Sequence, residues 1–278
     1  AVPVGDEARV PLQISTKNGV VTIRLNRPEK FNAIRERDTA AVREELNRAA
    51  LDPSVGAVIL TGTGRYYSAG ADFKDSMVLK WPSTLRSEKT LYNQQIFDMF
   101  LDFPKPILTA VNGPAIGMAV TSATLTDAII CSPNATFRTP FAELGLPPEG
   151  CSSINFPRLL GQKNSDRMLV QGETIDATTA LEIGLVKEVV ESSSLIPRAQ
   201  ELAEQMIQQR VVRPMLLQEG LKQQLKEANM RESVALGNAI MARPFFEANY
   251  KIAKKQNKKN AEWTFWILAQ ISPIISRL

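Results

Sequence analysis

The sequence predicts an α/β protein with a helical C-terminal region, and two patterns support this prediction. Short apolar runs that suit buried strands, such as 56–61 and 107–111, are each followed by a loop containing glycine and then by a helical pattern. From residue 194 onward the spacing of apolar residues becomes almost wholly helical. We therefore expect a core over residues 1–192 and a C-terminal helical region with an extended tail over residues 193–278.

The chain opens with a predicted hairpin. Residues 10–15 and 20–26 alternate apolar and polar side chains, as expected for two half-buried strands. Asn18 and Gly19 lie between them, and both residue types tolerate the positive φ angles of a tight hairpin turn.

Further elements follow in order along the chain. Residues 36–51 place apolar side chains on one helical face, and Asp52-Pro53 ends that helix. Thr174 is expected to cap a short helix that Gly184 ends. The remaining elements are strands over 56–61, 107–111, 128–131 and 185–190, and helices over about 88–102, 116–125 and 194–260.

The composition excludes several function classes. Hydrophobic residues make up 44% and charged residues 22% of the chain, which is typical of globular and not of disordered proteins. The absence of histidine excludes Ser-His-Asp hydrolysis and His-based zinc sites, and two cysteines exclude a disulfide framework. A net charge of +4 is too small to imply nucleic acid but suits an anionic small ligand.

Two loops carry residues that suit a site for negative charge. Ser68–Phe73 follows one apolar strand, and Asn112–Met118 follows another. Small residues let a ligand approach the backbone, and free backbone N–H groups bind an oxyanion. Either loop alone is commonly an ordinary glycine turn, but the pair predicts two donors from separate loops.

A candidate base lies in the segment 141–151. Glu149 is held between prolines and a glycine with apolar flanks, an environment that raises a carboxyl pKa toward the range of a general base. The alternative is a solvent-exposed turn glutamate, and Glu143 competes for the same role.

These segments resemble the crotonase superfamily, in particular its peroxisomal Δ3,Δ2-enoyl-CoA isomerase branch. The resemblance covers most of the chain and implies a spiral of ββα units with a C-terminal helical trimerisation layer. The pieces that carry it are Asn26–Pro28, Asn32–Ile34, Ser68–Phe73, Asp102–Ile107, Asn112–Met118, Thr139–Phe141 and Leu144–Ser153.

The resemblance also implies roles for individual residues. Glu149 corresponds to the base, and the backbone N–H groups of Ala71 and Met118 correspond to the oxyanion hole. The two glutamates of the family's hydratases are replaced here by Thr121 and Phe141, which disfavours addition of water. The expected substrate and CoA contacts are Glu29, Lys30, Phe31, Asn32, Ser68, Ala69, Gly70, Asp72, Phe73 and Gly117.

The implied reaction needs one base and no metal or redox cofactor, with coenzyme A present only as part of the substrate. One carboxylate takes a proton from C2 and returns it to C4, and two backbone donors stabilise the thioester enolate between these steps. The alternatives are another acyl-CoA reaction of the same superfamily, such as hydration or a secondary-metabolism step, and a CoA-binding assembly module without catalysis.

The chain ends in Ser276-Arg277-Leu278, which is similar to the Ser-Lys-Leu peroxisomal address. Together with the resemblance, this predicts recognition by the peroxisomal import receptor and location in the peroxisomal matrix. The resemblance further implies a homotrimer or a dimer of trimers. The apolar stretch 263–275 is too short to span a bilayer, so we expect no membrane span.

Overall fold

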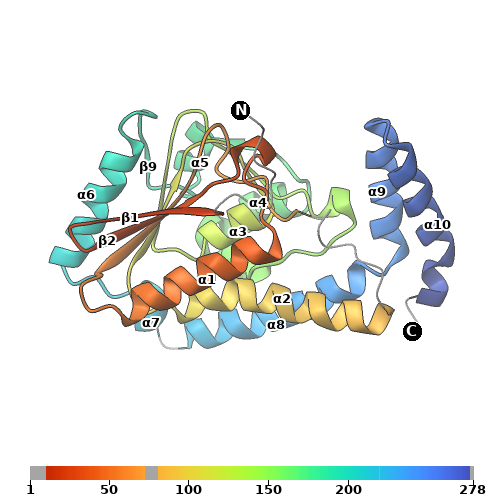
Figure 1. The fold of residues 1–278 in the computed structure, drawn as a ribbon, viewed down its shortest axis with the longest axis horizontal. Helices are drawn as coiled ribbons and strands as arrows, with labels where there is room; N and C mark the ends of the chain where they lie inside the picture. Colours follow the sequence, from red (N-terminus) through yellow and green to blue (C-terminus); the bar gives the residue numbers. More distant parts are fainter. Residues whose placement is uncertain (1–10, 73–80, 219, 276–278) are drawn as a thin grey trace, which may run out of the picture.

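The computed structural model describes residues 11–72, 81–218 and 220–275. Phe73 and the terminal Ser276–Leu278, both included in the sequence predictions, lie outside these ranges. The described chain forms a mixed α/β structure with two sheets (Figure 1).

The larger sheet is mostly parallel. Its order is β1-β2-β3-β4-β6-β9, and only β1 and β2 pair antiparallel. Asn18 and Gly19 connect these two strands with φ angles of 50° and 76°, so the predicted hairpin is confirmed. The strands are β1 (Leu12–Lys17), β2 (Val20–Leu25), β3 (Ala57–Gly62), β4 (Ile107–Val111), β6 (Ala128–Cys131) and β9 (Glu188–Val189).

A second, smaller sheet has the order β5-β7-β8. Its strands are β5 (Ala115–Ile116), β7 (Thr136–Arg138) and β8 (Ile175–Asp176). The helices are α1 (Glu36–Leu51), α2 (Pro82–Asp102), α3 (Met118–Ala123), α4 (Ser152–Leu169), α5 (Ala177–Glu182), α6 (Leu195–Gln208), α7 (Pro214–Leu217), α8 (Leu221–Ala239), α9 (Arg243–Lys255) and α10 (Lys259–Ile275), with short 3₁₀ turns η2 (Pro28–Lys30) and η3 (Ala142–Leu144).

Alternate side chains of the central strands pack in opposite directions, because successive residues of a strand face opposite sides of the sheet. Val58 and Leu60 of β3 belong to a core cluster with α1, α2 and α8, whereas Ala57 and Ile59 pack with α6. Figure 1 shows α6 on one side of the sheet and α1, α2 and α8 on the other. The division of the chain at residue 192 stays a prediction. α6, which follows this position, packs on the larger sheet.

The last two helices form an arm at one end of the molecule (Figure 1). Phe245 and Phe246 of α9 join the core cluster around the smaller sheet, as does Ala269 of α10. Trp263 and Trp266 remain 65% and 46% exposed in this chain. Among the described helices none has both the length and the apolar character needed to cross a membrane.

Three local predictions need correction. α2 begins at Pro82, not near residue 88, because a proline fits the first turn of a helix. The cap at the start of α5 is Asp176 and not Thr174, since Asp176 Oδ1 accepts the Thr179 N–H at 2.8 Å. The helix expected from residue 116 begins at Met118, because the two residues before Gly117 pair with β7.

One buried arginine ties the C-terminal helices to the core. Arg213 is fully buried between α6 and α7, and its Nε donates to Asp127 Oδ2 at 3.0 Å. Its Nη groups donate to the backbone carbonyls of Phe100, Phe103 and Leu125. A single guanidinium therefore satisfies three buried carbonyls and one buried carboxylate.

We predict that Arg213→Ala lowers the free energy of unfolding by about 3–5 kcal/mol, because it leaves the buried Asp127 charge unpaired. Guanidinium denaturation followed by circular dichroism measures this loss. Arg48→Ala is the control, since Arg48 is exposed and forms a surface ion pair with Glu45 of the same helix. Equal midpoints for the two variants would contradict the assigned role of Arg213.

Candidate active site

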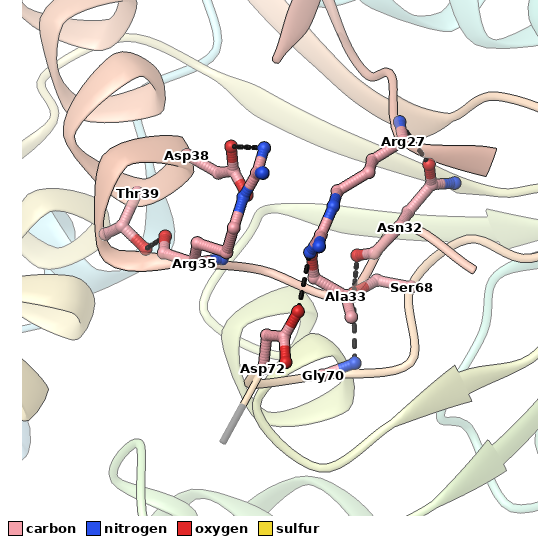
Figure 2. A network of polar contacts seen from close by, with 9 residues as sticks. All are labelled: Arg27, Asn32, Ala33, Arg35, Asp38, Thr39, Ser68, Gly70 and Asp72. Atoms are coloured by element: carbon pink, nitrogen blue, oxygen red, sulfur yellow. Dashed lines mark hydrogen bonds and ion pairs between the residues drawn. The ribbon is translucent and has the colours of Figure 1, made fainter. Parts of the chain in front are cut away.

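A buried polar network joins the loop after β3 to the segment after β2 (Figure 2). The amide of Asn32, which is 1% exposed, donates to carbonyls of the 63–67 loop at 2.8–3.2 Å and accepts the Arg27 N–H at 2.9 Å. Ser68 Oγ donates to the Asn32 carbonyl at 2.8 Å and accepts the Gly70 N–H at 3.1 Å. The side chains of Asn32 and Ser68 thus hold the Gly70 backbone in place.

An ion pair closes the same network on its other side. Arg27 Nη1 lies 2.6 Å from Asp72 Oδ2 and donates to the Ala33 carbonyl at 3.1 Å. The two charged side chains are 7% and 13% exposed, so the pair is largely shielded from water. Figure 2 shows the Asp72 carboxylate pointing toward Arg27. Asp72 therefore anchors the end of the loop.

The backbone direction at Ala71 follows from these contacts. The Ile34 N–H donates to the Gly70 carbonyl at 2.8 Å, and the Asp72 N–H donates to the Ile34 carbonyl at 2.9 Å. Since successive peptide groups of an extended chain point in opposite directions, the Ala71 N–H points away from Ile34. It has no hydrogen-bond acceptor among the residues that the structure describes.

The second free N–H group belongs to Met118. Gly117 has φ 58° and ψ −124°, a conformation open to glycine, and donates its N–H to the Arg138 carbonyl at 2.8 Å. Met118 opens α3, so its own N–H has no acceptor within the helix. A Cβ atom built on Gly117 would meet no atom within 4 Å, so the space beside this turn is open.

The two loops are in close contact at Gly70, which has a φ of 82°. A Cβ atom there would lie 2.5 Å from the Ile116 carbonyl oxygen and 3.8 Å from the Met118 nitrogen. Gly70 must therefore be glycine for the loops to approach. The contact brings the loop that carries Ala71 close to the start of α3, and the pairing of the two N–H groups as donors to one oxygen stays a prediction.

Glu149 lies in the turn that leads into α4. Gly150 and Cys151 follow with φ angles of 71° and 63°, which bend the chain sharply before the helix. Burial raises the pKa of Glu149 to about 8, and the negative charge of Glu232 on α8 contributes to the increase. The prediction that apolar surroundings raise this pKa is confirmed.

Glu143 differs from Glu149 in its surroundings. Its carboxylate forms an ion pair with Arg138, and its side chain is 55% exposed. Of the two glutamates that the sequence offers in this segment, Glu149 is the less exposed, and burial raises its pKa.

The turn of Glu149 contacts the helix that carries Met118. A Cβ atom on Gly150 would lie 2.8 Å from Thr121 Oγ1 and 2.6 Å from the Phe97 ring, so both side chains pack directly on this turn. Thr121 in turn donates to the Met118 carbonyl at 3.3 Å. The turn that carries the base candidate therefore packs on the helix that Met118 opens.

Other residues expected to bind substrate lie near the network. Glu29, Lys30 and Phe31 are exposed on and after η2, and the Phe31 ring stacks at 4.6 Å on Tyr66. Ala69 N–H donates to the Phe31 carbonyl at 2.9 Å, which holds the two segments together. Contact of these residues with coenzyme A stays a prediction.

Two residues near Glu149 were not predicted from the sequence. The hydroxyl of Tyr92 on α2 lies 2.9 Å from that of Thr39. Burial raises the pKa of Tyr92 to about 12, and the charge of Glu149 makes a smaller contribution in the same direction. Glu232 is buried on α8. Neither residue has a local sequence signal, because only the packing of distant helices brings it to Glu149.

Comparison with known proteins gives consistent matches. A family model described as enoyl-CoA hydratase/isomerase matches residues 15–264. Enoyl-CoA delta isomerase 2 of Homo sapiens is 38% identical over 187 residues, 66% of this chain and 47% of that protein. Enoyl-CoA delta isomerase 3, peroxisomal, of Mus musculus is 38% identical over 184 residues, 65% and 57% of the two chains. This chain thus spans about half the length of these two relatives.

Solved structures share the fold. The crystal structure of an enoyl-CoA hydratase/isomerase from Pseudoalteromonas atlantica T6c has a TM-score of 0.79 and 30% identity. The match covers 88% of this chain and 98% of that one. The chain therefore belongs to the enoyl-CoA hydratase/isomerase family, the crotonase superfamily, and has its α/β fold.

Proposed function

We propose that this protein is an isomerase that converts 3-enoyl-CoA to trans-2-enoyl-CoA in the oxidation of unsaturated fatty acids. One observation carries the proposal. Burial raises the pKa of Glu149 to about 8, and its turn packs on the helix that Met118 opens. The loop that carries Ala71 contacts the start of the same helix at Gly70. The names of the human and mouse relatives support the same reaction.

In the proposed reaction Glu149 acts twice. Its carboxylate removes a proton from C2, and the C2–H electron pair moves into the thioester, which becomes an enolate. The N–H groups of Ala71 and Met118 donate to the enolate oxygen, where the negative charge accumulates. The enolate then collapses toward a C2–C3 double bond while Glu149 returns the proton to C4. Neither step needs a metal or a redox cofactor.

Hydration is the less suitable reaction for this site. Thr121 and Phe141 occupy the positions where the family's hydratases carry two glutamates, and both side chains are buried. Neither side chain can act as a carboxylate acid or base. A single base suits a proton shuttle between two carbon atoms of one substrate.

Glu29, Lys30, Phe31 and Ala69 are proposed to border the CoA moiety, with Gly117 beside the thioester. Asn32, Ser68, Gly70 and Asp72 would act mainly through the backbone, since their polar groups already bind within the protein. We also propose a homotrimer or dimer of trimers, and import into the peroxisomal matrix through Ser276–Leu278. The peroxisomal name of the mouse relative supports this location.

We predict that purified protein converts trans-3-hexenoyl-CoA to the 2-enoyl product and that Glu149→Gln lowers kcat roughly 100- to 10,000-fold, because it removes the base. Formation of the 2-enoyl thioester measures the rate. Glu143→Gln is the matched control and should keep wild-type activity, since Glu143 is exposed.

Wild-type protein that binds CoA but does not isomerise 3-enoyl-CoA would contradict the proposal. Turnover of another thioester would then favour a different acyl-CoA reaction of the superfamily. Loss of turnover on every thioester would favour a binding module.

The pH dependence follows from the raised pKa. Glu149 must be deprotonated to act, so kcat/KM should rise with pH and level off above about 8. Initial rates at low substrate across this range measure the rising limb. A limb near the ordinary glutamate value of about 4.3 would show that Glu149 is hydrated in the working enzyme.

We predict that Ser68→Ala lowers kcat by up to about 100-fold, because Gly70 and Ala71 lose the hydroxyl that holds them and the donor is misplaced. The pH of the rising limb should stay unchanged, since Glu149 is untouched. Ser87→Ala, on the exposed face of α2, is the control. Unchanged kcat in Ser68→Ala would remove the network from the account of the site.

A further inference from the structure

A second carboxylate is bound to the same helix that Glu149 precedes. Glu232, on α8, is 6% exposed, and its Oε1 accepts the Ser153 N–H at 3.0 Å and the Ser153 hydroxyl. Ser153 lies in the first turn of α4, where backbone N–H groups lack partners within the helix. Glu232 therefore satisfies the start of α4 from another helix.

The remaining oxygen of Glu232 has no such role. Oε2 is buried without a hydrogen-bond partner among the described residues. The Ser152 hydroxyl is also buried and also has no hydrogen-bond partner among them. An unpaired oxygen on a buried carboxylate costs free energy. Helix capping alone uses only Oε1, so the cost calls for a further explanation.

The turn that Glu232 holds also contains the base. The Ser152 N–H donates to the Glu149 carbonyl at 3.3 Å, and Ser153 follows directly. Movement of Glu232 would thus move the backbone of Glu149. The same arrangement places a second buried carboxylate near Glu149 with no cation hydrogen-bonded to it among the described residues.

We propose that Glu232 is a positioning residue for Glu149, which anchors the 149–153 turn to α8 and sets the electrostatic environment of the base with its own negative charge. This inference rests on the proposed function and names a part of its site. Glu232 needs no contact with substrate for this role.

The charged and titratable groups around the pair come from several elements. Burial raises the Glu232 pKa most strongly. The two Ser153 donors, the Cys151 N–H and, least of all, the exposed Arg231 favour its ionised form. Asp98 on α2 is held by Asn229 Nδ2 at 3.0 Å. The Cys151 thiol donates to the Leu225 carbonyl at 3.2 Å. Burial raises the pKa of Cys151 and of Tyr92 on α2, so both groups stay protonated.

The charge of Glu232 makes Glu149 a stronger base. A negative neighbour disfavours the ionised form of Glu149, so it raises the pKa beyond the effect of burial alone. Removing that charge should lower the Glu149 pKa and move the rising limb of kcat/KM to lower pH. A purely structural role of Glu232 would lower the rate without moving this limb.

The test compares pH profiles of kcat/KM with trans-3-hexenoyl-CoA from roughly pH 5 to pH 10. We expect Glu232→Gln, which keeps the shape and an acceptor for Ser153, to move the limb down by on the order of one pH unit. Glu232→Asp keeps the charge and should keep the limb near its wild-type position. Glu227→Gln, an exposed glutamate on the same helix, is the matched control. A limb unmoved in Glu232→Gln would overturn the proposal.

A second measurement needs no activity. Glu232 is already ionised when Glu149 loses its proton, so Glu232→Gln should lower the pKa of Glu149 in protein without substrate. Carbon-13 titration of the Glu149 carboxyl group measures this shift, with Glu227→Gln as the control. An unshifted Glu149 would overturn the proposal, whereas an inactive wild type with the shift present would remove only the proposed reaction.

Discussion

The position of the Ala71 N–H group depends on the hydrogen bonds of Asn32 and Ser68. These two side chains join segments that follow different strands, and they orient a peptide group that no regular strand or helix holds. Without them the loop after β3 would keep its small residues but lose a defined donor direction. Gly70 then lets this loop approach the start of α3 closely.

The environment of the base differs from that of the donor loop, because burial and not hydrogen bonding determines its chemistry. The turn that contains Glu149 packs against Phe97 and Thr121. A carboxylate in such a place is less stable than one in water, and this cost makes it a stronger proton acceptor. The neighbouring Glu232 increases the cost further. The free energy needed to hold the two carboxyl groups in this environment must come from the rest of the core.

Much of the fold can be predicted from local sequence, and the reasons for failure are also local. The hairpin at Asn18, helix α1 and strand β4 agree with their patterns because turn residues and apolar periodicity coincide there. α4 escapes prediction because Pro157 and Gly161 interrupt its pattern, and Gly161 bends it with a φ of 75°. β7 has only three residues, too few for an alternation to be visible.

The site divides in the same way. Glu149 and the two loops can be found because glycine, proline and apolar neighbours surround them within a few residues. Glu232 cannot be identified from its neighbours in the sequence, because its hydrogen bond to Ser153 joins positions 79 residues apart. Only the packing of α8 against α4 makes it part of the site.

The central claim is that one carboxylate both removes and returns the proton. Turnover of 3-hexenoyl-CoA deuterated at both C2 positions, in ordinary water, tests it most directly. Proton transfer by Glu149 alone predicts product with one deuterium at C2 and deuterium also at C4, because a shielded base keeps the label. Product with only solvent hydrogen delivered to C4 would contradict the claim and assign protonation to water or a second group.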